Sequence, residues 1–218
     1  MLGYFNDDGQ VAVLYSPGYG CGWSNTYNNR HEGLLFHPEI VQRVLDGDRD
    51  LITQEWLEEL GFSNVYIGGV SQLEIFWLSP GERFLVTEFD GFEEITTISD
   101  FDLTVPICSE TTYCEDEQVA VLISPDWGSG WYTSNGRNES LLFHPEIVQR
   151  VLDGDRDLIT QEWLEELGFS NVYTEGVSQL EITWLSPGER FLITEHDGSE
   201  EIITVSDLET TAPSLPVS

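Results

Sequence analysis

The stretch "LLFHPEIVQRVLDGDRDLITQEWLEELGFSNVY", residues 34–66, decides the architecture because the chain carries it twice. The same 33 letters return at residues 141–173, 107 positions further along a chain of 218 residues. Matches extend to both sides of this stretch, since QVAVL, GVSQLEI, WLSPGERFL and EEI also occur in each half. A repeat of about 95 residues is too long for a solenoid and has the size of a small domain. The sequence therefore predicts a tandem duplication of one domain.

The matches and the composition set the expected boundaries. We expect a first repeat unit over residues 1–105 and a second over residues 118–208. Between them, residues 106–117 form an acidic linker, PICSETTYCEDE. The tail at residues 209–218 is rich in Pro, Ser and Thr without periodicity, which indicates an extended or disordered segment.

Within each unit the pattern predicts the order strand, loop, two helices and three strands. HPEIVQRVLDG predicts a helix that begins after His37, with Pro38 in its first turn, and ends at Gly47. TQEWLEELGF predicts a second short helix that Thr53 caps. VAVLYS, QLEIFWL, RFLVTEF and EEITTIS have the apolar or alternating pattern of strands. The expected class is α+β, with a mostly antiparallel sheet and two short helices in each unit.

The charge is strongly one-sided, because 40 acidic residues face eight basic ones and the formal net charge is −32. Every basic residue is an arginine, and the chain has no lysine. One interpretation is adaptation to high salt, which screens repulsion between carboxylates. The other is imitation of a nucleic-acid backbone, so that the chain occupies the basic groove of a DNA- or RNA-binding protein. Both interpretations disfavour direct nucleic-acid binding, since no basic patch is present.

Location is inferred from what the sequence lacks. No apolar run approaches the roughly 18 residues that span a bilayer, and the first residues, MLGYFNDDGQ, do not have the pattern of a secretory signal. We therefore expect no membrane partner and a cytoplasmic location in an organism with an acidic, salt-adapted proteome. A bridge between Cys108 and Cys114 is left open, although a reduced compartment favours free thiols.

A glycine-rich loop between the first strand and the first helix is the main candidate binding site. It reads YSPGYGCGWSNTYNNRHEG in the first half and ISPDWGSGWYTSNGRNES in the second. Glycines let a ligand approach the backbone, tryptophan offers a stacking face, and Ser and Asn supply hydrogen bonds. The alternative is a loop that packs on its own tryptophan. The candidate residues are Gly20, Gly22, Trp23, Ser24, Asn25, Gly128, Gly130, Trp131 and Asn135.

His37 and His144 are the histidines that both halves share, and they complete the set of candidate binding residues. The alternative role for each is a place at the start of a helix. No second matched His or Cys accompanies them, so a metal site is not expected. A hydrolase would need one of them beside the carboxylates around the Asp90–Gly91 turn or its counterpart. Those carboxylates are also explained as a charged edge that prevents strand pairing.

The repeated DGDRD resembles the opening of a calcium-binding loop. An EF-hand also needs Gly at position 6 and Glu at position 12, and this chain has leucine at both. We expect a solvated turn and no cofactor, with weak calcium binding as the alternative. The weak metal candidates are Asp46, Asp48, Asp50, Asp153, Asp155 and Asp157.

The order VAVL(Y/I)SPxxGxGW, LLFHPEIV, GVSQLEIxWLxPGERF and TExDGxEEI resembles small uncharacterised proteins of tailed phages and other microbial viruses. The resemblance implies a viral accessory or host-interaction role and carries no activity or catalytic residue. The leading hypothesis is a non-enzymatic binding protein whose two units engage a protein partner or a small ligand bivalently. A nucleic-acid mimic and a hydrolase are the alternatives.

Overall fold

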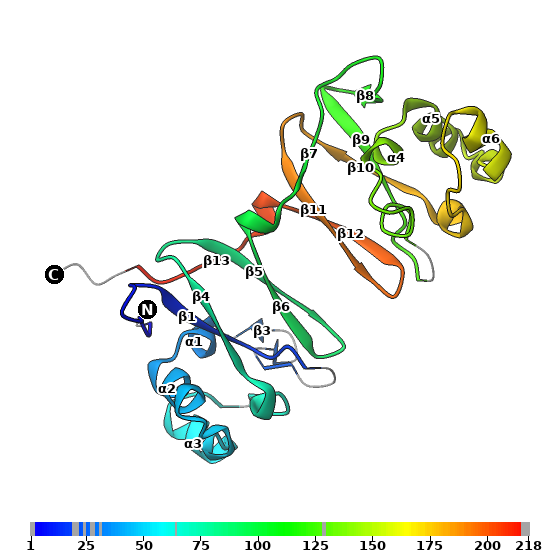
Figure 1. Cartoon of the computed structure of the whole chain (residues 1–218). Helices are drawn as coiled ribbons and strands as arrows, with labels where there is room; N and C mark the ends of the chain where they lie inside the picture. Colours follow the sequence, from blue (N-terminus) through cyan, green and yellow to red (C-terminus); the bar gives the residue numbers. More distant parts are fainter. Residues whose placement is uncertain are drawn as a thin grey trace. The chain divides into compact units, whose positions relative to one another are not determined.

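The chain is described from a computed structural model, which covers all residues except 1–2, 19–21, 24, 27–28, 31, 64, 128–129 and 215–218. Contacts divide the chain into two compact units (Figure 1). Unit 1 comprises Met1–Ile98 together with Ser206–Ser218, and unit 2 comprises Ser99–Val205. Each unit contains helices and antiparallel sheets, which confirms the predicted α+β class.

Apart from the two-residue strands β2, β3 and β8, the two units share one order of elements. Unit 1 contains the helices α1 (Glu32–Leu35), α2 (Pro38–Asp46) and α3 (Gln54–Glu59), and the strands β1 (Val11–Tyr15), β2 (Asn25–Thr26), β3 (Asn29–Arg30), β4 (Glu74–Leu78), β5 (Arg83–Phe89), β6 (Phe92–Thr97) and β13 (Thr210–Thr211). Unit 2 contains the helices α4 (Glu139–Leu142), α5 (Pro145–Asp153) and α6 (Gln161–Glu166), and the strands β7 (Leu103–Thr104), β8 (Cys114–Glu115), β9 (Gln118–Ile123), β10 (Glu181–Leu185), β11 (Arg190–His196) and β12 (Ser199–Thr204).

The long helix of each unit begins and ends where the sequence predicts. His37 occupies the N-cap position of α2, and its main-chain carbonyl accepts hydrogen bonds from Ile40 and Val41. Gly47 ends the helix with φ of 82°, a left-handed conformation that suits glycine. At the start of α3 the Thr53 hydroxyl accepts the main-chain N–H of Trp56 at 3.3 Å. The second repeat reproduces these helix boundaries in α5 and α6.

The strands form two antiparallel layers in each unit instead of one sheet. β1 pairs with β4, while β5 and β6 form a hairpin closed by Asp90 and Gly91, both with positive φ. Such an Asp-Gly pair suits the twist of a two-residue hairpin turn. In unit 2, β9 pairs with β10, and β11 pairs with β12 in the same register.

The first strand of each unit is buried on both faces, which explains its unbroken apolar sequence. Ala12 and Leu14 belong to a core beneath the helices, whereas Val11 and Val13 belong to a second core beneath the β5–β6 hairpin. Each unit is therefore layered as helices, strand pair and hairpin (Figure 1). The first repeat's Trp23 and the second repeat's Trp131 lie in the helix-side cores.

The last strand of each unit comes from the other repeat. β7 pairs with β11 of unit 2, although its sequence ends the first repeat. β13 pairs with β5 of unit 1, although its sequence ends the second repeat. The compact units therefore differ from the predicted boundaries, because each C-terminal segment hydrogen-bonds to the edge strand of the other copy. Part of the predicted tail is accordingly a strand of unit 1.

In the part of the chain that the structure describes, no helix is long and apolar enough to cross a bilayer.

Candidate functional site

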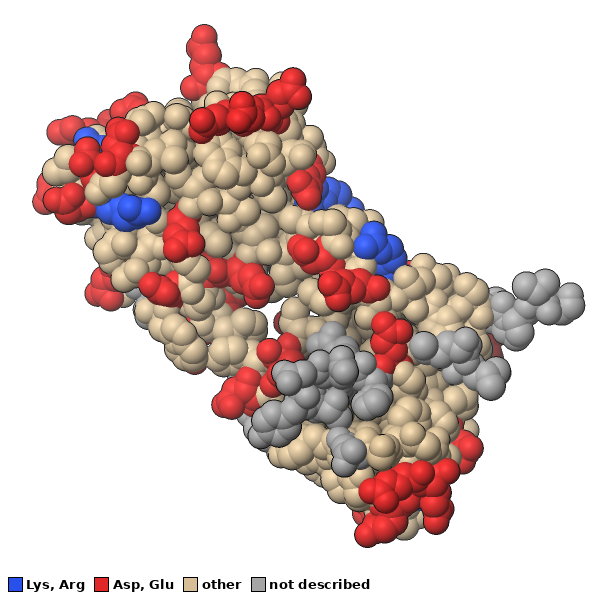
Figure 2. Space-filling view, turned by 180° about the vertical axis from the view of Figure 1, so that it is seen from behind, with Lys and Arg blue, Asp and Glu red and all other residues tan. Residues whose placement is uncertain are grey.

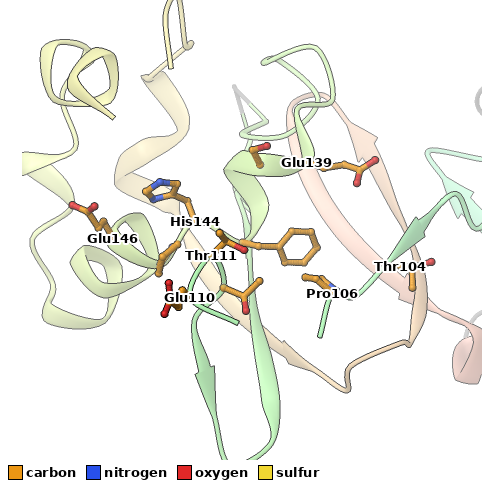
Figure 3. Close-up of a pocket in the computed structure, with 11 residues that line it drawn as sticks. Thr104, Pro106, Glu110, Thr111, Glu139, His144 and Glu146 are labelled. Carbon is orange, nitrogen blue, oxygen red and sulfur yellow. The ribbon is translucent and has the colours of Figure 1, made fainter. Parts of the chain in front are cut away.

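A pocket of about 550 Å³ opens in unit 2 beside His144, one of the predicted candidate residues. Three segments meet there: the loop before β8, the short helix α4 and the start of α5 (Figure 3). The lining comprises Thr104, Pro106, Glu110, Thr111, Thr112, Glu139, Ser140, Phe143, His144, Pro145 and Glu146. The volume falls within the range of small-molecule sites.

Local sequence fixes the two helical walls of the pocket. Asn138 caps α4 by accepting the main-chain N–H of Ser140 at 3.1 Å, which places Glu139 and Ser140 in the first turn. Pro145 fits the first position of α5, where its missing N–H costs no hydrogen bond. Glu146 then lies in the first turn of α5, where the helix dipole favours a carboxylate.

The third wall is the loop that the sequence analysis treated as a linker. Cys108 and Cys114 form a disulfide with Cα atoms 5.9 Å apart, so the favoured expectation of free thiols is corrected. Inside this loop the Ser109 main-chain N–H donates to the Thr112 hydroxyl at 2.9 Å. The Thr112 hydroxyl is also within 3.3 Å of the Ile107 carbonyl oxygen. These bonds hold the lining residues Glu110, Thr111 and Thr112 in a compact turn.

His144 lies at the N-cap of α5 but its side chain does not cap the helix. Its ring packs edge-on against Phe169, with ring centroids 5.3 Å apart. The Nδ1 atom is buried and has no hydrogen-bond partner within the described residues. Burial lowers the pKa of His144 below its ordinary value, and the Glu146 carboxylate offsets only part of this effect. The ring is therefore neutral near pH 7.

The charge of the pocket is entirely negative. Glu110, Glu139 and Glu146 line it, and no Arg is among the lining residues. The remaining lining combines hydroxyl groups with the apolar surfaces of two prolines and Phe143. Such a lining suits a ligand that has both a positive group and an apolar part.

Unit 1 has the helical walls of this pocket. Glu32, His37 and Glu39 stand where Glu139, His144 and Glu146 stand in unit 2. His37 likewise packs edge-on against Phe62 and has a pKa lowered by burial. The two units therefore present the same side chains at the starts of these helices.

The glycine-rich loops are placed differently from the predicted ligand-binding arrangement. The side chains of Trp23 and Trp131 are 0% exposed and pack in the cores, so neither offers an open stacking face. A Cβ atom on Gly130 would lie 2.6 Å from Oε1 of Glu200, so this glycine makes room for the chain's own carboxylate. These contacts match the self-packing alternative.

Asn135 is held by the chain's own main chain. The Asn135 amide donates to the Trp131 carbonyl at 2.7 Å, and its oxygen accepts the main-chain N–H of Tyr173. Gly22 is buried beside Glu93. Gly20, Ser24 and Gly128 lie outside the described residues, and Asn25 is described only as part of strand β2.

Two carboxylates that the sequence analysis assigned to a charged edge hold these loops instead. Glu93 is 0% exposed and accepts the N–H groups of Ser16 at 2.8 Å and Trp23 at 2.9 Å. Glu200 is 1% exposed and accepts the N–H groups of Ser124 at 3.0 Å and Thr133 at 2.8 Å. The sequence contains a signal for this role. Adjacent residues of a strand face opposite sides, so one glutamate of each Glu-Glu pair has to point inward while Glu94 and Glu201 are exposed.

The aspartate-rich turns do not gather into a metal site. Within the described residues, no three His, Cys, Asp or Glu side chains converge as metal ligands. Asp46 and Asp153 instead accept hydrogen bonds from Gln42 and Gln149 one helical turn earlier. Arg49 and Arg156, which follow Asp48 and Asp155, donate to main-chain carbonyls at 2.9 and 2.8 Å. These contacts give Asp50 and Asp157 no role in binding a metal ion.

Acidic side chains are spread over the surface. On the face shown in Figure 2, Asp and Glu gather in several separate groups and not in one continuous band. A nucleic-acid mimic needs carboxylates that follow one another at the spacing of phosphates. This face therefore gives the mimic hypothesis no support.

Comparisons of the chain with protein-family models, with curated proteins and with solved structures found no match.

Proposed function

We propose that the chain is a non-enzymatic binding protein whose pocket in unit 2 takes a small organic cation, an amine or a guanidine with an apolar part. The observation that carries the proposal is the pocket's lining of three glutamates without a basic side chain. Carboxylates form their strongest hydrogen bonds with ammonium and guanidinium groups. A net charge of −32 adds a field that attracts cations and repels anions.

The neutral state of His144 supports a cation as the ligand. Burial keeps its pKa below the ordinary value, so the imidazole does not neutralise Glu146 near pH 7. Phe143 and the two prolines of the lining supply the apolar surface that a carbon chain between two charges would contact. A ligand such as agmatine, with an ammonium group at one end and a guanidinium group at the other, has this chemistry.

Binding is favoured over hydrolysis by the surroundings of His144. A catalytic histidine needs a second group that orients its ring, and within the described residues Nδ1 of His144 has no hydrogen-bond partner. The carboxylates of the pocket come from the loop and the helices, and none comes from the hairpin that the hydrolase hypothesis requires.

Isothermal titration of the full chain with agmatine tests the proposal. The test variant is Glu139→Gln/Glu146→Gln, and the matched control is Glu32→Gln/Glu39→Gln, which removes the equivalent charges from unit 1. We expect the test variant to weaken binding about tenfold and the control to change it less than twofold, since each charge-assisted bond contributes about 1.5–3 kcal/mol before screening. Equal losses in both variants would mean general attraction by the acidic surface and would contradict a site.

The same account includes an origin by tandem duplication. Its support is the identical 33-residue stretch and the matching order of elements. Bivalent binding by two equivalent sites requires a second pocket in unit 1, and a titration stoichiometry of two agmatine molecules per chain would favour that version. We also propose a viral accessory role and a high-salt cytoplasm, the second supported by the net charge of −32.

A further inference from the structure

The receiving edges of β5 and β11 are the same short surface presented twice. We use "receiving edge" for residues 81–84 of unit 1 and 188–191 of unit 2, both with the sequence Gly-Glu-Arg-Phe. Each holds an "inserted segment", residues 208–213 in unit 1 and residues 101–106 in unit 2.

Main-chain hydrogen bonds hold both inserted segments in the same way. In unit 1 the Ala212 N–H donates to the Glu82 carbonyl at 2.8 Å, and the Gly81 N–H donates to the Ala212 carbonyl at 3.0 Å. In unit 2 the equivalent bonds join Val105 to Glu189 at 2.8 Å and Gly188 to Val105 at 2.9 Å. These bonds do not depend on side chains, so either edge accepts any extended segment that fits.

An arginine of each receiving edge fixes the start of its inserted segment. The Arg83 Nε donates to the Leu208 carbonyl at 3.0 Å, and Arg190 Nη2 donates to the Phe101 carbonyl. Both arginines stand at equivalent positions of the repeat. A guanidinium group on a main-chain carbonyl again recognises backbone and leaves the choice of side chains open.

Side chains distinguish the two inserted segments. Alternate residues are buried in both: Phe101, Leu103 and Val105 in unit 2, and Leu208, Thr210 and Ala212 in unit 1. At every one of the three positions the segment in unit 1 has the smaller or more polar side chain. Leu103 and Val105 belong to the core beneath β11, whereas only Ala212 of the other segment belongs to the core beneath β5.

The two cores that receive these side chains are largely alike. Val11, Val13, Leu78 and Phe84 beneath β5 match Val119, Val121, Leu185 and Phe191 beneath β11. The cores differ at Val86, where unit 2 has isoleucine, and at the half-buried Tyr15 and Phe76, where it has isoleucine and threonine. The segment on the receiving edge of unit 1 therefore buries less apolar surface than the segment on the equivalent edge of unit 2.

We infer that the receiving edge of unit 1 is a docking site for an extended segment of a partner protein with three alternating apolar residues followed by proline. Such a segment adds a strand beside β5 and displaces residues 208–213. A second copy of this chain is not the expected occupant. If its residues 101–106 moved to this edge, its own receiving edge would lose the same buried side chains, so the total buried apolar surface would not increase. A partner protein has no such edge to leave empty, so its larger apolar side chains add buried surface.

The size of the gain follows from the side chains. Each additional buried methylene strengthens association about fourfold at room temperature. Relative to the segment of unit 1, Val105 adds two carbons, Leu103 adds two and Phe101 adds three, and together they correspond to more than a hundredfold. A tethered segment competes at an effective concentration of about 1 mM. A free peptide with the sequence of residues 101–106 should therefore bind the full chain with a Kd of about 10 µM or tighter.

Titration of the full chain with the capped peptide Phe-Asp-Leu-Thr-Val-Pro tests this inference. Hydrogen exchange should show residues 208–213 released while the amides of β5 stay protected. The control peptide Leu-Glu-Thr-Thr-Ala-Pro, with the chain's own residues 208–213, should bind at least about a hundredfold more weakly. No saturable binding of the first peptide, or equal binding of both, overturns the inference.

Two variants of the full chain change the resident segment in opposite directions. Thr210→Leu/Ala212→Val copies the side chains of the other segment and should weaken peptide binding at least tenfold. Leu208→Ala weakens the resident segment and should tighten peptide binding about tenfold. Binding that is the same in both variants contradicts displacement at this edge. Dimers of the chain that form without peptide and exchange residues 101–106 would instead identify a second copy as the occupant and overturn the inference.

Discussion

The helices α2 and α3 of unit 1 have the same sequences as α5 and α6 of unit 2, yet the units differ where segments from the other repeat join them. The stretch from Leu34 to Tyr66 and its copy form the same helices with the same boundaries. Residues of the loop at 106–113 line a pocket of unit 2, and the two inserted segments have different side chains. The identical helices are thus a common scaffold, and the two units differ in the loop and the inserted segments that pack against it.

Replacement of the two buried glutamates that hold the glycine-rich loops is the strongest way to test whether the scaffolds are equivalent. Glu93→Gln and Glu200→Gln should each lower the free energy of unfolding of their own unit by about 4 kcal/mol, because a buried N–H donor then faces an amide group. Hydrogen exchange of β1 and β9 reports the two units separately. Glu94→Gln and Glu201→Gln, which are exposed, are the controls and should change stability by less than about 0.5 kcal/mol.

Truncation of the inserted segments should separate the two units. Leu103→Ala removes a buried core side chain and should destabilise unit 2 by about 3 kcal/mol. Thr210→Ala at the equivalent position should destabilise unit 1 by about 1 kcal/mol, since less apolar surface is lost. Exchange rates of the β11 and β5 amides measure the two effects. Equal losses would show that the segments are held with equal strength.

Removal of the disulfide should act on the pocket and leave unit 1 unchanged. In Cys108→Ser/Cys114→Ser the loop with Glu110, Thr111 and Thr112 gains freedom. Agmatine affinity should fall about threefold, since the loop must then be ordered on binding. Titration calorimetry measures this change, and unaltered affinity would show that hydrogen bonds within the loop suffice.

Acidification should have the smallest effect and should act on both units alike. The folded pKa of His37 and His144 lies below the ordinary value of 6.5, so the unfolded chain takes up the proton first as pH falls. The free energy of unfolding should therefore fall below pH 6.5, by less than about 1 kcal/mol per ring because solvent reaches both rings. His37→Gln/His144→Gln cannot titrate, so its difference from the native chain between pH 7 and pH 5 isolates this effect. A difference in the free energy of unfolding that does not change between pH 7 and pH 5 would contradict this effect.

Local patterns predicted the elements well. The helix after His37, the Thr53 cap and the hairpin at Asp90–Gly91 all follow from residues within one or two turns of each other. The sequence does not predict which strands pair over long distances along the chain. Leu103 and Thr210 follow a strand in both copies, and nothing in their own sequence states which copy of the receiving edge they join.

The candidate site was predicted only in part. His144 was identified because both repeats carry it, but its neighbour Glu110 lies 34 residues away in a segment interpreted as a linker. The glycines around Trp23 and Trp131 predict a ligand site, yet Gly130 makes room for the buried Glu200, and the Trp23 N–H donates to the buried Glu93. Glycines in a loop indicate that another group lies close to the backbone. Only the fold shows that this group is a carboxylate of the same chain and not a ligand.

The exchange of terminal strands is most directly tested by nuclear Overhauser contacts between backbone protons across the strands. The structure pairs Thr211 with Arg83 and Thr104 with Arg190. We therefore predict contacts within these two pairs in the full chain. Contacts of Thr104 with Arg83 and of Thr211 with Arg190 would mean that each repeat closes on its own segment, which would contradict the account.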